Sequence, residues 1–187
     1  MKAAVPKTEK ENKVRVALPD ISERHQVHII NPMSGRGAAG ANIYSAVEKS
    51  AAESGGEILK SERPGHIEEL AAQACAKDPF VHIIAYGGDG TVNETVSGIM
   101  KSGAARTASF SIVPVVGSGN DFSAYVNDSG VFAKAELNKI DVVRVTCGDD
   151  VRYFANMMNI GFDCNVVKET YTLKKKPFLH GSAAYIA

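Results

Sequence analysis

Hydrophobic residues along the chain form short runs that alternate with longer amphipathic segments. The short runs are rich in apolar and β-branched residues and predict strands at Val27–Ile30, Glu57–Lys60, Val81–Tyr86 and Ser109–Val116, of which Glu57–Lys60 is the weakest. Between them, apolar residues recur at helical spacing, and we expect helices over Ala38–Ser54, His66–Lys77 and from Thr91 to about Met100. This alternation predicts an α/β fold, a three-layer arrangement in which helices cover a parallel sheet.

The pattern changes near residue 140. Two apolar runs there are joined by Gly148, Asp149 and Asp150 with no helix between them, which is typical of an antiparallel hairpin. The predicted parts of the chain are a polar leader over residues 1–24 with a short strand at Val14–Leu18, an α/β domain over residues 25–132, and a β-rich second domain over residues 138–187. A few strands cannot close a core, so we expect the second domain to be incomplete, as in a truncated chain, and its open edges to favour a homodimer.

Composition narrows the function classes. The 21 Lys and Arg residues balance the 21 Asp and Glu residues, which argues against a large basic face for nucleic acid. No apolar run approaches the roughly 20 residues that cross a bilayer, and the first residues lack the apolar core of a signal peptide. We therefore expect a cytoplasmic protein.

Cysteine and histidine spacing argues against a zinc site. Cys75, Cys147 and Cys164 are far apart, and we expect all three to be small buried apolar residues in a reducing compartment. Four histidines also lack the spacing of metal ligands and are expected to be structural or surface groups: His25, His28, His82 and His180.

A first glycine-rich loop, Gly35–Gly40, fits the G-x-G-x-x-G spacing of a dinucleotide-binding loop. Glu62 lies where such a site needs an acidic residue for the ribose. A single match of this kind is weak evidence, and it does not explain why two more glycine loops follow later strands. The phosphate loop of Walker A proteins is excluded, because G-x-x-x-x-G-K-[ST] does not occur.

The central loop, Gly87–Gly90, follows the strongest predicted strand. Its glycines allow the backbone to approach a ligand closely, and we expect Thr91 and Glu94 to form a capping box at the start of the next helix. Free N–H groups and the helix dipole then create an anion site. Asp89 would repel a phosphate there, so it indicates Mg²⁺-linked chemistry or a general base; the alternative is a tight turn that Asp89 only caps.

Gly117–Asp121 is a similar turn after the next strand. Two glycine loops at the carboxyl ends of neighbouring parallel strands would line one crevice, which is where open α/β sheets bind ligands. The alternative is two unrelated turns.

Several segments, in order, resemble motifs of the diacylglycerol-kinase-like catalytic domains, a family of bacterial lipid kinases and sphingosine kinases that is distantly related to NAD kinases. The segments are Asn31–Gly35, Ser61–His66, Gly87–Glu94, Gly117–Phe122, Ile140–Val142 and Asn159–Asp163. The resemblance runs from about Val27 to the last residue. It implies a nucleotide-binding α/β domain and a β-sandwich domain with ATP between them.

The resemblance also implies site residues. Those implied to bind ATP are Asn31, Ser34, Gly35, Ser61 (where the family usually has Thr), Gly87, Gly88, Asp89, Gly90, Thr91, Val92, Asn93, Ser118 and Asn120. Asp89 is the implied catalytic residue, which contacts Mg²⁺ or accepts the proton of the attacking hydroxyl. His66 either contacts the nucleotide or makes a local hydrogen bond. A further carboxylate and a structural Mg²⁺ site of the bacterial relatives correspond to no residue of this chain.

Three functions stay open. The first is an ATP- and Mg²⁺-dependent lipid kinase acting on diacylglycerol or a related lipid, which the segments Gly117–Phe122 and Asn159–Asp163 favour. The others are an NAD-kinase-like activity and a nucleotide-binding module without turnover. Lys174–Lys176 with Pro177, Phe178 and Leu179 either docks on an anionic membrane or forms a solvated loop.

Overall fold

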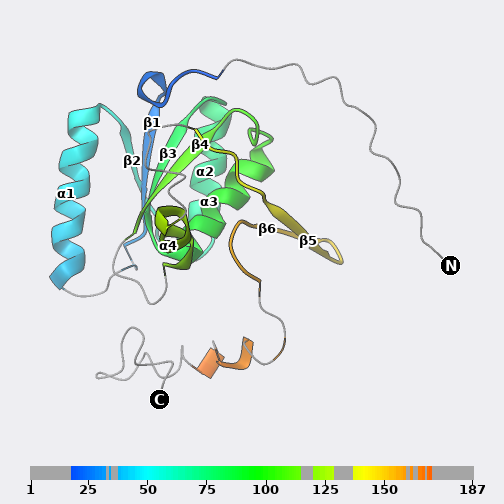
Figure 1. Ribbon diagram of the computed structural model, residues 1–187. Helices are drawn as coiled ribbons and strands as arrows, with labels where there is room; N and C mark the ends of the chain where they lie inside the picture. Colours follow the sequence, from blue (N-terminus) through cyan, green and yellow to red (C-terminus); the bar gives the residue numbers. More distant parts are fainter. Residues whose placement is uncertain are drawn as a thin grey trace.

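The computed structural model of the chain describes residues 18–32, 34, 38–114, 120–128, 137–158, 161, 164–166 and 168–169 (Figure 1). The elements are a 3₁₀ turn at Ile21–Glu23, β1 (Gln26–Ile30), α1 (Ala38–Ser54), β2 (Glu57–Lys60), α2 (His66–Lys77), β3 (His82–Gly87), α3 (Asp89–Ser102), β4 (Ser109–Pro114), α4 (Asp121–Asp128), β5 (Val143–Cys147) and β6 (Asp150–Phe154).

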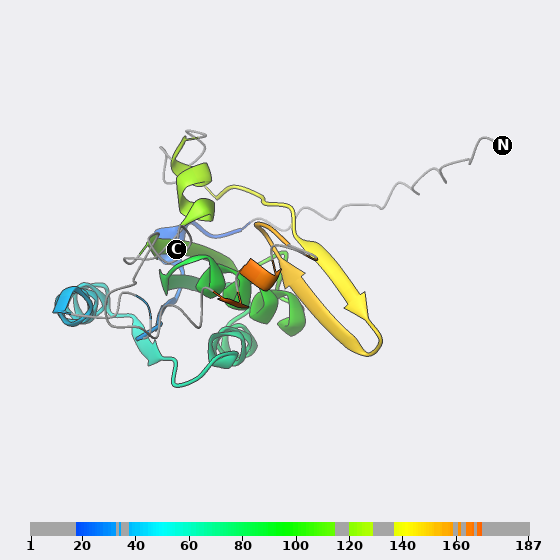
Figure 2. The same cartoon turned by 90° about the horizontal axis from the view of Figure 1, so that it is seen from below.

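Strands β1 to β4 form a parallel sheet in the order β2-β1-β3-β4, as the alternating pattern predicted. Helix α1 covers one face of this sheet, and α2 and α3 cover the other (Figures 1 and 2). Because both faces are covered, β1 and β3 are buried along almost their whole length. The predicted α/β fold class is therefore confirmed.

The main core lies between the sheet and helices α2 and α3. The face predicted for α2 is buried there: Ile67, Leu70, Ala71, Ala74 and Cys75. Gly98 of α3 allows the two helices to pack closely, because a Cβ at this position would press on the Glu68 carbonyl and lie 2.7 Å from the Ala71 Cβ. A smaller cluster between the sheet and α1 contains Ile30, Val47 and Tyr86.

Strands β5 and β6 form the predicted antiparallel hairpin, which turns at Gly148 with a φ of 59°. The hairpin extends from the side of α3 that faces away from α2 (Figure 2). The hairpin packs against α3 through an apolar cluster, and the Ser97 hydroxyl of α3 donates a hydrogen bond to the Tyr153 carbonyl at 3.0 Å. The members of the cluster are Val92, Val96 and Phe122, with Met100, Phe110, Ile112, Ile140, Val142, Tyr153 and Ala155 packed against them. Helix α3 is thus shared by the parallel sheet and the hairpin.

Several details differ from the predictions, and one of them is that β1 begins one residue before the predicted Val27. Helix α3 begins at Asp89 rather than Thr91, and β3 runs one residue later than Val81–Tyr86. Cys75 is buried as expected, but the prediction was wrong for Cys147 and Cys164, which are exposed. Cys147 ends a hairpin strand whose residues are mostly exposed, so the core does not cover it.

Some predictions lie outside the described residues. These are residues 1–17 of the leader with most of the strand predicted at Val14–Leu18, the end of the strand predicted to reach Val116, and the Lys174–Leu179 segment. Among the residues that the structure describes, no helix is both long and apolar enough to cross a bilayer.

Candidate functional site

Loops that follow the strands meet at the carboxyl edge of the parallel sheet. The Asn31 side-chain amide, just after β1, donates a hydrogen bond to the Thr91 hydroxyl at 3.1 Å, and the Asn31 N–H donates to the Tyr86 carbonyl. A Cβ on Gly88, after β3, would lie 3.3 Å from the Asn120 Oδ1 just before α4. Residues that the sequence placed in separate motifs are therefore neighbours in space.

The start of α3 presents unpaired backbone donors. The N–H groups of Thr91 and Val92 both donate to the Gly88 carbonyl, at 2.9 and 3.2 Å. Asp89 and Gly90 precede them, and within the described part of the chain their N–H groups have no hydrogen-bond acceptor. Gly90 is exposed, and a Cβ there would meet no described atom within 4 Å. Two donors and the positive end of the α3 dipole are therefore the groups that an anion site at this position would use, and the anion site itself stays a prediction.

The Asp89 carboxylate is held by another helix. Its Oδ2 accepts a hydrogen bond from the Asp121 N–H at 3.2 Å, and its Oδ1 accepts one from the Phe122 N–H at 3.0 Å, so Asp89 caps α4. Oδ1 also accepts a hydrogen bond from the Asn156 side-chain amide at 3.2 Å. These donors offset the negative charge that would otherwise repel a phosphate bound at the start of α3.

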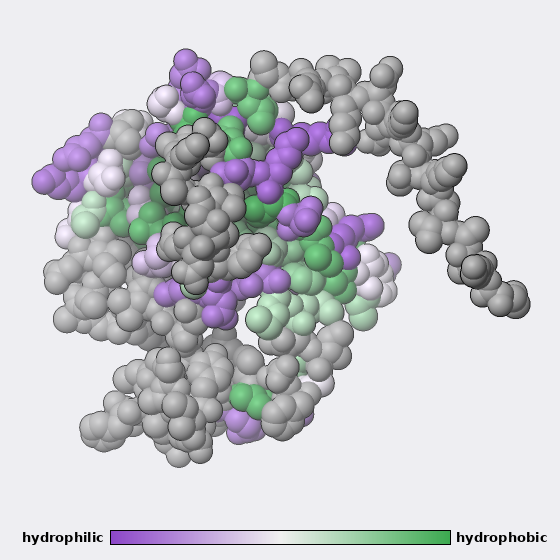
Figure 3. Space-filling model, in the orientation of Figure 1, coloured by the Kyte–Doolittle hydropathy of each residue, from purple (hydrophilic) through white to green (hydrophobic). Residues whose placement is uncertain are grey.

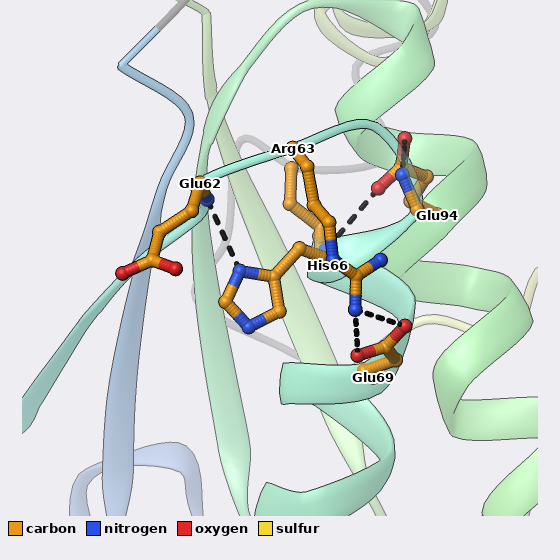
Figure 4. A network of polar contacts seen from close by, with 7 residues as sticks. Glu62, Arg63, His66, Glu69 and Glu94 are labelled. Carbon is orange, nitrogen blue, oxygen red and sulfur yellow. Dashed lines mark hydrogen bonds and ion pairs between the residues drawn. The ribbon is translucent and has the colours of Figure 1, made fainter.

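The predicted capping box at Thr91 and Glu94 is wrong. Because α3 begins at Asp89, Glu94 lies too far into the helix to cap it, and its carboxylate instead accepts hydrogen bonds from the Gly65 and Ile67 N–H groups, at 3.1 and 3.2 Å (Figure 4). These two residues form the start of α2, whose N-cap, Gly65, has a φ of 81° and no side chain with which to cap the helix. Glu94 therefore caps the neighbouring helix and fixes the loop that leads into it.

That loop carries a second group of polar contacts (Figure 4). Arg63 forms an exposed ion pair with Glu69, at 2.6 Å. His66 Nδ1 accepts a hydrogen bond from the Glu62 N–H at 3.1 Å, which is the local role that the sequence had left open for this histidine. With Nδ1 accepting, the neutral ring carries its proton on Nε2. Ser61 begins the loop and is buried, and its N–H donates to the Ile30 carbonyl beside Asn31.

The remaining predicted site residues have different surroundings. The Ser34 N–H donates to the Asn31 carbonyl in a turn after β1. Val92 packs in the cluster beneath the hairpin, so its side chain faces the core. Asn93 is half-buried, and its Oδ1 has no hydrogen-bond donor among the described residues. Gly35 and Ser118 lie outside the described residues.

Buried histidines behind the loops have structural contacts, as expected. The His28 ring stacks on Tyr86 and its Nδ1 lies 2.9 Å from the Tyr86 hydroxyl; burial lowers the pKa of His28 and raises the pKa of Tyr86. His82 lies within hydrogen-bond distance of the Ser109 and Ser111 hydroxyls. Burial, followed by the charges of Arg24 and His28, lowers the pKa of His82 to about 4.

Asn156 is the site residue that sequence reasoning missed. It follows β6 by two residues and lies 67 positions from Asp89, so no local spacing relates the two. The available signal was weak: Asn156 is an uncharged polar residue within the apolar stretch Phe154–Met158.

Comparisons with known proteins identify the family of the chain. A family model described as the diacylglycerol kinase catalytic domain matches residues 25–149. The chain is 29% identical over 167 residues to "Putative lipid kinase YtlR" of Bacillus subtilis, a match that covers 78% of the chain and 50% of that protein. It is 35% identical over 112 residues to "Probable lipid kinase YegS-like" of Pectobacterium atrosepticum, which covers 56% of the chain and 36% of that protein.

A solved structure is also similar. It is a crystal structure of a diacylglycerol kinase from Bacillus anthracis, 29% identical with a TM-score of 0.45, and the match covers 56% of this chain and 37% of that one. The chain spans between about a third and a half of the length of the curated relatives named above.

Proposed function

Because the chain belongs to the diacylglycerol kinase catalytic domain family, we propose that it is an ATP- and Mg²⁺-dependent lipid kinase, which transfers the γ-phosphoryl group of ATP to a hydroxyl of diacylglycerol or a related lipid. One observation carries the proposal: the N–H groups of Asp89 and Gly90, which have no acceptor among the described residues, lie beside a carboxylate whose charge is offset by the start of α4. Such a site accepts a phosphate and still offers a carboxylate to the chemistry.

The described residues fit a nucleotide phosphate. Two N–H groups at the start of α3 have no acceptor in the described part of the chain. Gly87 is also required, because a Cβ there would collide with the Thr91 side chain and displace the loop. Asn31 holds Thr91 from the other side. We propose that the described nucleotide-binding residues are Asn31, Ser34, Ser61, Gly87, Gly88, Asp89, Gly90, Thr91, Val92, Asn93 and Asn120, with Gly35 and Ser118 completing the site.

The same residues fit a Mg²⁺ that is bound together with the nucleotide. Among the described residues, no group of three or more His, Cys, Asp or Glu side chains is placed to hold a metal. Mg²⁺ commonly binds through one or two carboxylates, substrate phosphates and water, and Asp89 supplies one carboxylate. When bound, Mg²⁺ offsets the negative charge of the phosphoryl group in transfer.

The proposed work of the protein is to position the reactants. The N–H groups at the start of α3 would orient the phosphates, and Asp89 would contact Mg²⁺ or accept the proton of the lipid hydroxyl as that oxygen attacks the γ-phosphorus in line. The bond between the γ-phosphorus and the β,γ-bridging oxygen breaks in this step, and ADP leaves. The Asp89 carboxylate can accept a further hydrogen bond, because a carboxylate accepts about four and the described residues donate three.

Exposed apolar surface supports a lipid acceptor. The surface around the hairpin contains hydrophobic residues on the face shown in Figure 3. Exposed large apolar side chains in and around the hairpin are Leu137, Val143, Met157 and Met158. We propose that the chain works in the cytoplasm at the surface of the membrane that contains its lipid substrate.

The first test is a thermal melt of the chain with ATP and Mg²⁺, and with NAD as the control ligand. A ligand that binds only the folded state and is present at 100 times its Kd adds about 2.7 kcal/mol, which raises the midpoint. Transfer of labelled γ-phosphate to diacylglycerol in detergent micelles, against NAD as the competing acceptor, then tests the reaction. A shift with ATP but no transfer would favour a nucleotide-binding module, and transfer to NAD alone would refute the lipid kinase.

Gly90→Ala gives a sharper test of the site. The added Cβ meets no described atom of the protein, so the melting midpoint without ligand should not fall. A phosphate on the α3 N–H groups would meet this methyl group, so ATP affinity should fall several-fold. Gln73→Ala, at an exposed position of α2, is the control and should change neither quantity. Unchanged ATP affinity in Gly90→Ala would place the phosphate elsewhere.

A further inference from the structure

The side chain of Asn156 connects the hairpin to the candidate site. Its Nδ2 donates a hydrogen bond to Asp89 Oδ1 at 3.2 Å. Asp89 begins α3, whereas Asn156 follows β6, and the two residues are 67 positions apart in the sequence. Asn156 is half-buried at the point where the chain leaves β6. A side chain that directly follows the hairpin thus contacts the carboxylate at the start of α3.

This contact makes the two oxygens of Asp89 unequal. Among the described residues, Oδ1 accepts two hydrogen bonds, from the Phe122 N–H and from Asn156, whereas Oδ2 accepts one, from the Asp121 N–H. With about two lone pairs on each oxygen, Oδ1 is saturated and Oδ2 keeps one accepting position. The terminal torsion of an aspartate is soft, so its orientation depends on such donors.

We propose that Asn156 is a positioning residue that saturates Oδ1 of Asp89 and so leaves Oδ2 as the oxygen available to Mg²⁺–ATP. The inference rests on the proposed function, because it requires the site to bind ATP with Mg²⁺. It adds that nucleotide affinity depends on a side chain that follows the hairpin directly in the chain. Partners that orient a metal-binding carboxylate commonly change affinity by 10- to 100-fold when removed.

The structure also supplies a matched control. Ser97, near the middle of α3, donates its hydroxyl hydrogen bond to the Tyr153 carbonyl of β6 at 3.0 Å. Ser97→Ala therefore removes a second polar contact between α3 and the hairpin without touching Asp89. Any effect that comes from a loosened hairpin will appear in both variants, whereas an effect on the Asp89 carboxylate will appear only in variants of Asn156.

The experiment is calorimetric titration of the full chain with ATP, with Mg²⁺ and with EDTA. The variants are Asn156→Ala, Asn156→Asp, which keeps the shape but presents an acceptor to Asp89, and Ser97→Ala. We expect Asn156→Ala to lose about tenfold in affinity for ATP with Mg²⁺ and less with EDTA. Asn156→Asp should lose more, and Ser97→Ala should match the wild type. Melts verify folding, and Asn156→Asp decides the test if Asn156→Ala does not fold.

Each other outcome overturns the inference in a recognisable way. If the wild type binds ATP and the Asn156 variants bind it equally well, Asn156 does not position Asp89 and the proposed function stands. Equal losses in Asn156 and Ser97 variants, or a loss independent of Mg²⁺, assign the effect to hairpin packing. If the wild type binds no ATP, the proposed function fails and this inference fails with it.

Discussion

Replacing Glu94 by Gln tests how the loop before α2 is held. The carboxylate accepts hydrogen bonds from the Gly65 and Ile67 N–H groups, one on each oxygen. Glutamine keeps the size of the side chain but has one accepting oxygen, and its NH₂ group faces the second N–H. The substitution therefore removes one hydrogen bond and the negative charge at the start of α2.

The cost follows from burial. A hydrogen bond to a charged group contributes about 1.5–3 kcal/mol, and a charge at a helix start adds roughly 0.3–1 kcal/mol. Water could replace the bond if the N–H groups were exposed, but Ile67 is only 2% exposed and Gly65 is half-buried, so the N–H that faces the NH₂ group is poorly hydrated in either orientation of the amide. We therefore expect Glu94→Gln to lower the free energy of unfolding by about 2–3 kcal/mol.

Urea denaturation at neutral pH measures this loss as a lower midpoint with an unchanged slope. Glu69→Gln is the matched control, because it removes a carboxylate from the same region that pairs with Arg63 in solvent. Exposed ion pairs contribute little, so the control should lose much less stability. If both variants lose the same amount, the contact between Glu94 and the start of α2 does not hold the loop, and the reasoning is refuted.

Three further substitutions or conditions have clear expected outcomes. The pKa of His82 is lowered to about 4, so as the pH falls below 6.5 the unfolded chain takes up a proton on this histidine before the folded chain does. The neutral His82 therefore contributes roughly 3 kcal/mol at most to the free energy of unfolding; this contribution is complete above pH 6.5 and is lost as the pH falls toward 4. Urea midpoints across this range should show it, and His82→Gln should flatten the slope. Gly98→Ala should destabilise by about 1–2 kcal/mol despite better helix propensity, because its Cβ presses on Ala71; a raised melting midpoint would contradict this. Gly87→Ala should abolish the ATP-induced rise in midpoint by displacing Thr91, and an unchanged rise would show that the loop is not part of the site.

Much of the fold was predictable from the sequence. The bounds of α1, β2 and α2 agree with the amphipathic pattern and its glycine and proline stops. The parallel direction of β1 to β4 follows from the alternation of strands and helices, because each crossover helix returns the chain to the same end of the sheet. The glycine loops after the strands were likewise expected at one edge, and Asn31, Gly88 and Asn120 are neighbours there.

The hydrogen-bond partners of the polar side chains in the candidate site could not be predicted from local sequence patterns. Thr91 and Glu94 have the spacing of a capping box, but a start of α3 at Asp89 directs Glu94 to the neighbouring helix. Asp89 caps α4, and Asn156 reaches it from beyond the hairpin. Local spacing encodes which face of a helix is apolar, because the helix repeat is fixed. Hydrogen bonds between distant side chains depend on how whole elements pack, so only the tertiary structure determines them.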